Sequence, residues 1–320
     1  MVARNMSRRQ LIRDMVVAGT AAPIVGLAAA RRGGGRSEFK ICIFSKHLQW
    51  LDYNAMAETA AELGFDGVDL TVRNKGHVLP ERVEDDLPKA VEAIKRAGID
   101  PLMMATDIND PDDPNTEKIL KTASALGIKY YRLGKYRYTE DKSITSTLND
   151  ASPMIRDLAA MNEHYNIFGS YQNHAGNGYV GAPLWDLWEL IKELDPRYMG
   201  CQFDIRHATV EGGQTWPLNL RLMSKHINTL AIKDFLWQMR DNKWQTVNCP
   251  LGQGQVDYDG YLQLLKKLSV SGPISIHYEY DLGGANHGAT KLTIGKEKLF
   301  AAIQADLRFL RACLRENGLL

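Results

Sequence analysis

Tyr198-Met199-Gly200-Cys201-Gln202-Phe203-Asp204-Ile205-Arg206-His207-Ala208 is the stretch that decides the fold. Read as a β-strand, it directs Gly200, Gln202 and Asp204 to one face and Cys201 and Phe203 to the other, because side chains alternate along a strand. One face is small and polar, and the other is apolar. Helices cover both sides of an open parallel sheet and keep both faces apolar. A polar face that ends in a carboxylate therefore favours a barrel whose lumen opens into a site.

Strand patterns alternate with helical patterns from residue 40 onward. Several helical patterns end in a turn signal such as Leu63-Gly64 or Leu126-Gly127, which is typical of repeated βα units. Strands are expected at 40–44, 67–71, 101–105, 130–134, 167–171, 199–204, 227–232 and 274–280. Eight units within residues 37–320 match a single-domain (β/α)8 TIM barrel. The competing doubly wound sheet is disfavoured because no GxGxxG or Walker-type loop follows the first strand.

Charge and cysteine usage narrow the class of ligand. The chain has 320 residues with 39 Lys and Arg against 38 Asp and Glu, so no overall field attracts nucleic acid or an anionic membrane. A small neutral or polar ligand fits this balance better. The four cysteines show no CxxC spacing, which indicates packing residues and neither a zinc site nor a disulfide framework.

The first 36 residues have the layout of an export signal. A basic segment with paired arginines, Arg8 and Arg9, precedes an apolar run at 15–30 and a small-residue cleavage pattern. The arginine pair followed by Leu-Ile resembles a twin-arginine signal, and 31–36 is typical of a flexible junction. The sequence therefore predicts a periplasmic or otherwise exported protein without membrane attachment after cleavage. An uncleaved anchor is the alternative.

Polar side chains follow the last four predicted strands. In a TIM barrel these strand ends meet at one mouth, where active sites lie. The side chains are Ser170, Gln172 and His174 on the fifth strand, Asp204 and His207 on the sixth, Thr229 and Lys233 on the seventh, and Ser275, His277 and Glu279 on the eighth. Two carboxylates, Asp204 and Glu279, are expected at one mouth. This favours a functional role over the alternative, in which they form a structural pair that binds loop amides.

Other candidates lie in the loops that follow strands. His47 and Lys135 stand where substrate-contacting groups belong, and Lys135 could meet an acidic substrate or pair with rim carboxylates. Trp237 belongs to a set of loop tryptophans suited either to sugar rings or to packing on the barrel rim. Trp185 and Trp188, three residues apart on a helix, are expected in the core. The segment 252–254, Gly-Gln-Gly, favours a tight turn over a phosphate cradle.

Several motifs together resemble the xylose isomerase-like TIM barrels, a group of sugar isomerases and epimerases that includes tagatose-type 3-epimerases and inosose dehydratase. The motifs are LGFDGVDL at 63–70, YQNH at 171–174, FDIRH at 203–207, IKD at 232–234, LGQGQVD at 251–257 and YEY at 278–280. The resemblance implies a divalent metal held by a Glu, an Asp, the His of an HxKD motif and a second Glu, on the fifth to eighth strands. Asp204 and Glu279 match this set. Gln172 and Ala231 occupy the other two positions, so the ligand set is incomplete.

The two departures favour a one-base reaction. The epimerases of this group use two carboxylates on opposite sides of the substrate carbon, and Gln172 cannot be a base. Aldose–ketose isomerisation, or elimination next to a carbonyl, is expected, with Glu279 as the base and with Lys233 and His207 as the other catalytic groups. His47, Gln172, His174, Lys135 and Trp237 are the expected substrate contacts. The alternative is a non-catalytic carbohydrate-binding barrel with a degraded metal site.

The cofactor prediction stays open between two arrangements. A divalent Mn, Mg or Zn ion could bind Asp204 and Glu279 together with Gln172 or His207. Alternatively, Lys233 takes the place of the metal as a fixed cation beside a developing oxyanion. No nucleotide cofactor and no nucleic-acid partner are expected, only a small carbohydrate, and the sequence does not predict the oligomeric state.

Overall fold

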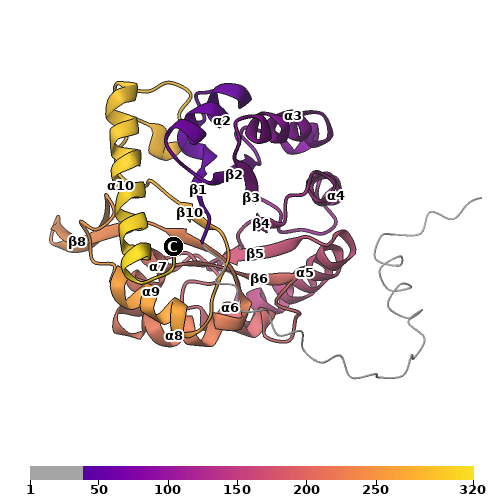
Figure 1. Cartoon of the computed structure of the whole chain (residues 1–320). Helices are drawn as coiled ribbons and strands as arrows, with labels where there is room; N and C mark the ends of the chain where they lie inside the picture. The colour runs from indigo at the N-terminus through magenta and orange to yellow at the C-terminus, as the bar shows by residue number, and fades with distance from the viewer. Residues whose placement is uncertain (1–38) are drawn as a thin grey trace, which may run out of the picture. The chain divides into compact units, whose positions relative to one another are not determined.

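Eight parallel strands close into a barrel, with neighbours in the order β1-β10-β7-β6-β5-β4-β3-β2 (Figure 1). The computed structural model describes residues 39–320, so the predicted export signal and junction at 1–36 lie outside the described residues. The barrel strands are β1 (Ile41–Phe44), β2 (Gly67–Val72), β3 (Asp100–Thr106), β4 (Tyr130–Arg132), β5 (Phe168–Gln172), β6 (Met199–Asp204), β7 (Ile227–Ile232) and β10 (Ile274–Ile276). The predicted (β/α)8 TIM barrel is confirmed.

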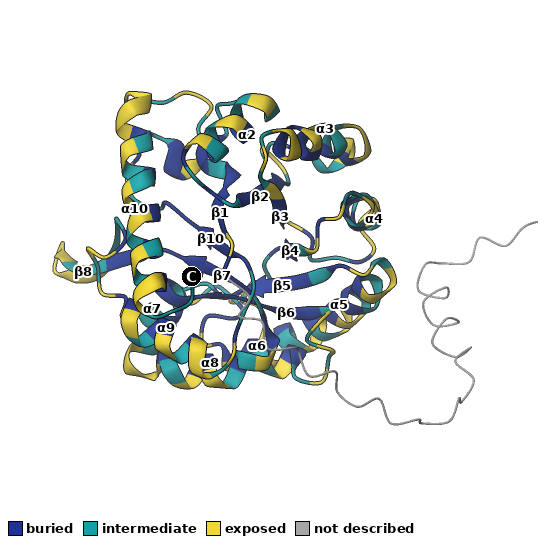
Figure 2. Cartoon of the chain, in the orientation of Figure 1, coloured by how far each residue is buried: buried dark blue, intermediate teal, exposed yellow. Residues whose placement is uncertain are grey.

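Helices surround the barrel and bury one side against it (Figure 2). They are α2 (Tyr53–Glu62), α3 (Val83–Arg96), α4 (Thr116–Leu126), α5 (Ile144–Tyr165), α6 (Trp185–Ile191), α7 (Ile205–Gly212), α8 (Trp216–Met223), α9 (Tyr258–Lys267) and α10 (Lys296–Glu316). Within residues 39–320, no helix is long and apolar enough to cross a bilayer. The strands carry almost entirely buried side chains, so the core lies both inside the barrel and between the barrel and the helices.

The segment 198–208 has the predicted alternation of side chains between the two faces of β6. Phe203 stacks on Tyr261 of α9 with 6.2 Å between ring centroids, so this face of β6 points outward to the helices. Gln202 and Asp204 lie on the other face and are fully buried. At Gly200, a Cβ atom would lie 2.4 Å from the carbonyl oxygen of His226, which explains why only glycine fits there. The polar face of β6 is therefore the lumen face.

Two elements were absent from the sequence prediction. Helix α7 starts directly after Asp204, and an antiparallel hairpin of β8 (Asp234–Arg240) and β9 (Lys243–Cys249) follows β7. Its turn residues, Asp241 and Asn242, have φ values of 50° and 56°, the left-handed conformation that two-residue hairpin turns require. Trp237 consequently lies on a hairpin strand and not in a loop. The expectation that Trp185 is a core residue is also wrong, because 57% of its surface is exposed.

The segment 252–254 is a turn built around a carboxylate. Asp234 accepts hydrogen bonds from the backbone N–H groups of Gly252 (3.0 Å), Gly254 (3.0 Å) and Val256 (3.2 Å). A Cβ atom at Gly254 would lie 2.1 Å from Oδ1 of Asp234. These amides already have a partner, so the turn fixes the start of the hairpin beside the barrel mouth and does not cradle a phosphate.

Asp234→Ala should lower the free energy of unfolding by at least about 3 kcal/mol, because several buried hydrogen bonds to one charged group are lost together. Urea denaturation measures this change. The exposed Asp85→Ala on α3, which forms only a surface ion pair with Arg82, is the control and should cost under about 1 kcal/mol. Equal losses in the two variants would contradict the structural role of Asp234.

Candidate active site

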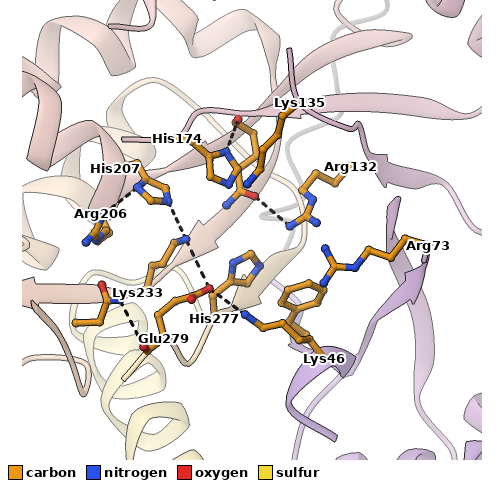
Figure 3. Close-up of a pocket in the computed structure, with 13 residues that line it drawn as sticks. Lys46, Arg73, Arg132, Lys135, His174, Arg206, His207, Lys233, His277 and Glu279 are labelled. Carbon is orange, nitrogen blue, oxygen red and sulfur yellow. Dashed lines mark hydrogen bonds and ion pairs between the residues drawn. The ribbon is translucent and has the colours of Figure 1, made fainter. Parts of the chain in front are cut away.

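A cavity of about 280 Å³ opens at the carboxyl ends of the barrel strands (Figure 3). Its volume is close to the lower end of small-molecule pockets, about 300 Å³, and suits a ligand of monosaccharide size. Six predicted site residues line it: Lys135, Gln172, His174, His207, Lys233 and Glu279. Side chains that end or follow β4, β5, β6, β7 and β10 therefore meet at one mouth, as expected for parallel barrel strands.

Asp204 lies at the base of this site and is fully buried. Its Oδ1 atom accepts the backbone N–H of His207 at 3.1 Å and so caps the N-terminus of α7. Its Oδ2 atom accepts a hydrogen bond from Nε2 of Gln172 at 2.7 Å and lies 3.1 Å from Nζ of Lys233. Both carboxylate oxygens are thus engaged by groups of the protein itself.

Lys233 follows β7 and points into the cavity toward Glu279 (Figure 3). Its ammonium nitrogen lies 3.1 Å from Oδ2 of Asp204, 2.9 Å from Nε2 of His207 and 4.0 Å from Oε1 of Glu279. The residue is 5% exposed. Two carboxylates, the buried Asp204 and the partly buried Glu279, are tolerated at one mouth because this fixed cation lies between them.

The divalent metal that the resemblance implies does not fit these residues. Ala231 has no ligand atom, and the amide nitrogen of Gln172 donates to the oxygen of Asp204 that a metal would need. Lys233 also places a positive charge 3.1 Å from that same oxygen. In the part of the chain that the structure describes, no three His, Cys, Asp or Glu side chains are grouped to hold a metal ion.

Glu279 follows β10 and has two ammonium groups beside it. Burial by itself would raise the pKa of this carboxyl, but Lys233 and Lys46 outweigh burial and hold the pKa below its ordinary value. Nζ of Lys46 lies 3.2 Å from Oε1 of Glu279. Glu279 is therefore ionised at neutral pH and able to accept a proton.

His174 and His207 lie side by side, with 4.9 Å between ring centroids. Burial lowers the pKa of both rings well below the ordinary value, and nearby cations lower it further, chiefly Lys135 for His174 and Lys233 for His207. Nδ1 of His207 accepts a hydrogen bond from the guanidinium of Arg206 at 3.0 Å. Both imidazoles are therefore neutral at neutral pH. Both nitrogens of His207 contact Arg206 and Lys233, whereas His174 uses Nδ1 for the carbonyl oxygen of Gln172 at 3.0 Å.

Two predicted contact residues lie elsewhere. His47 is fully buried beneath the loops: Nε2 accepts the backbone N–H of Tyr278 at 3.0 Å, and Nδ1 lies 3.1 Å from the carbonyl oxygen of Ala285. Because both ring nitrogens bind backbone, His47 joins the ends of β1 and β10. Trp237 is 40% exposed on the hairpin and does not line the cavity.

The sequence did not single out four lining cations: Arg206, which follows β6, and three others around Phe44. Lys46, Arg73 and Arg132 follow or end β1, β2 and β4, and each cationic group lies 5.3 to 5.4 Å from the ring centroid of Phe44. Nη1 of Arg132 donates to Oε1 of Gln172 at 3.1 Å. The rule that found Lys233 applies equally to the ends of the early strands and would have found all three.

Solved structures of sugar epimerases share this fold. D-psicose 3-epimerase from Clostridium cellulolyticum H10 superposes with a TM-score of 0.65 and 14% identity, over 86% of this chain and 99% of that one. The 3-keto-D-glucoside 4-epimerase of E. coli gives a TM-score of 0.63 and 16% identity, over 86% of this chain and 100% of that one. At such identities the likeness concerns the fold.

Sequence comparisons place the chain in a family. An uncharacterized protein of Methanocaldococcus jannaschii, MJ1311, is 23% identical over 135 residues, which cover 42% of this chain and 44% of that relative's own length. The family model described as "Xylose isomerase-like TIM barrel" matches residues 57–313, most of the barrel. The chain therefore belongs to the xylose isomerase-like TIM barrel family.

Proposed function

We propose that the protein is a sugar isomerase or epimerase that removes a proton from the carbon next to a carbonyl group. The observation that carries this proposal is the position of Lys233, whose ammonium lies between Asp204 and Glu279 at the mouth of the barrel. A general base and a fixed cation at one small cavity are the two parts that enolisation of a sugar requires.

In the proposed reaction, the Glu279 carboxylate accepts the proton from the substrate carbon. The electron pair moves onto the carbonyl oxygen, which becomes an enediolate oxygen stabilised by the ammonium of Lys233. The ammonium of Lys233, positioned by His207 at 2.9 Å, gives a proton to this oxygen and takes one back from the neighbouring hydroxyl oxygen. Glu279 then returns its proton to the neighbouring carbon, which favours isomerisation by one base on one face of the sugar.

Gln172 supports the one-base form of the proposal. Its amide donates to Asp204 at 2.7 Å and accepts from Arg132 at 3.1 Å. A side-chain amide that donates one hydrogen bond and accepts another has no basic group that could take a proton from carbon. Its role in the proposal is to orient Asp204 and Arg132 around the substrate.

Hydrogen exchange with solvent tests the proposed chemistry. We expect some member of a panel of aldoses, ketoses and their acidic derivatives to incorporate deuterium from D2O next to the carbonyl, detected by product NMR. The same spectra separate isomers from epimers and from an elimination product. A panel in which no sugar exchanges hydrogen would contradict the proposal.

A non-catalytic carbohydrate-binding barrel is the second candidate. It is favoured by Gln172 and Ala231, which stand where the resemblance implies two metal ligands. Calorimetric binding of a sugar that shows no exchange in D2O would favour this candidate over the enzyme.

The sequence pattern of residues 1–36 leads us to propose export by the twin-arginine route to the periplasm. Fractionation of cells that produce the full chain, with an Arg8→Lys/Arg9→Lys variant as control, tests this. Retention of the unaltered chain in the cytoplasm would contradict it.

A further inference from the structure

The cavity carries far more positive than negative charge. Its lining contains six cationic side chains and one carboxylate, Glu279: the cations are Lys46, Arg73, Arg132, Lys135, Arg206 and Lys233. Two of the cations have acidic partners, because Lys46 lies 3.2 Å from Glu279 and Lys233 lies 3.1 Å from Asp204. The excess of positive charge must therefore come from the other cations.

Arg73, Arg132 and Lys135 form a cationic cluster without a close acidic partner. Among residues 39–320, no carboxylate lies within 4.0 Å of their charged groups. Arg132 is only 6% exposed, and burial together with Arg73 lowers its pKa to about 10. Burial and Arg132 lower the pKa of Lys135 to about 8. Like charges held together in this way repel one another unless an anion lies between them.

The cationic cluster lies across the cavity from the proposed chemistry (Figure 3). Its members come from the ends of β2 and β4, whereas Lys233 and Glu279 follow β7 and β10, on the other side of the closed barrel. Phe44 supports the arrangement, since the guanidinium groups of Arg73 and Arg132 lie 5.4 and 5.3 Å from its ring centroid. The cavity is therefore polarised: Lys46 and Lys233 have carboxylates within 4.0 Å, whereas the cationic cluster has none that close and feels Asp69 only from farther away.

We infer, resting on the proposed function, that the substrate is a sugar with an anionic group, a carboxylate or a phosphate ester, which binds the cationic cluster. Guanidinium groups match the oxygens of both anions, and a lysine adds a point charge. The anionic end would lie at Arg73, Arg132 and Lys135, and the carbonyl end at Lys233 and Glu279. Such a substrate differs from the neutral ligand that the overall charge balance suggested.

Calorimetry with three matched probes tests this inference: D-glucose, D-glucuronate and D-glucose 6-phosphate. We expect at least one acidic probe to bind ten-fold or more tightly than glucose, with an affinity that falls as salt is added. Whichever acidic probe binds more tightly identifies a carboxylate or a phosphate as the recognised group.

Two variants and a control complete the experiment. Arg73→Gln and Lys135→Gln, at half-buried positions, should each remove most of the preference for the acidic probe over glucose. Arg156→Gln, at an exposed position on α5, should preserve the preference. The inference is overturned if glucose binds as tightly as both acidic probes, if no acidic probe binds, or if the preference survives both substitutions.

The outcome is separable from that of the proposed function. Tight binding of an acidic probe lost in Arg73→Gln, with no sugar exchanging hydrogen in D2O, would uphold the anion site and reject the enzyme. Exchange on neutral sugars alone would uphold the enzyme and reject the anion site.

Discussion

Glu279→Gln is expected to lower turnover by about 10²- to 10⁴-fold, the usual contribution of a general base. The substitution keeps the shape of the side chain but removes its capacity to accept a proton, together with the charge that pairs with Lys46. Because Glu279 is partly exposed at the cavity mouth, the folded structure should persist, and circular dichroism and the urea midpoint check this. Turnover is measured as deuterium incorporation on whichever sugar the wild-type protein exchanges.

A control substitution tests whether loss of any one carboxylate charge lowers turnover. Glu58→Gln lies at an exposed position on α2 and should leave both turnover and stability unchanged. Full turnover in Glu279→Gln would show that another group abstracts the proton. A loss of substrate affinity with unchanged kcat would assign Glu279 to binding and not to proton transfer.

Lys233→Met is expected to have two large effects. Removing the ammonium leaves Asp204 as an uncompensated buried charge, which should cost about 3 to 5 kcal/mol of folding free energy. Losing a cation from the developing oxyanion should also lower kcat by about 10²- to 10³-fold. Urea denaturation and deuterium incorporation measure the two effects separately.

A double variant keeps this prediction testable if Lys233→Met folds poorly. Asp204→Asn removes the orphaned charge while keeping an oxygen that can cap α7. Lys233→Met/Asp204→Asn should therefore regain most of the lost stability and remain inactive. Wild-type turnover in either variant that lacks Lys233 would contradict the role given to this residue.

The alternation of side chains along strands, and the order of the strands, explain why the sequence predicted much of the site. Asp204 ends its strand, Lys233 and Glu279 come shortly after theirs, and the ends of parallel barrel strands meet at one mouth. The sequence could not say which groups touch. The contact between Lys233 and Asp204 depends on side-chain conformations across two strands, and the capping of α7 by Asp204 depends on a short helix of weak periodicity.

The net charge of the whole chain gave no indication of the cationic cluster. A chain with 39 basic and 38 acidic residues is nearly neutral overall, yet Arg73, Arg132 and Lys135 gather at one wall of the cavity. Conversely, His47 was expected at the substrate because it follows a strand, but its ring binds backbone atoms on both sides. The position of a residue after a strand does not reveal whether its side chain binds backbone atoms within the protein or faces the cavity.

We propose that the ammonium of Lys233 supplies the positive charge that the family resemblance assigns to a metal. Elemental analysis of the purified chain, combined with turnover before and after chelation, tests it most directly. We predict far less than one equivalent of Mn, Mg or Zn per chain and turnover unchanged by EDTA. One tightly bound equivalent, whose removal abolishes turnover and whose return restores it, would contradict the claim.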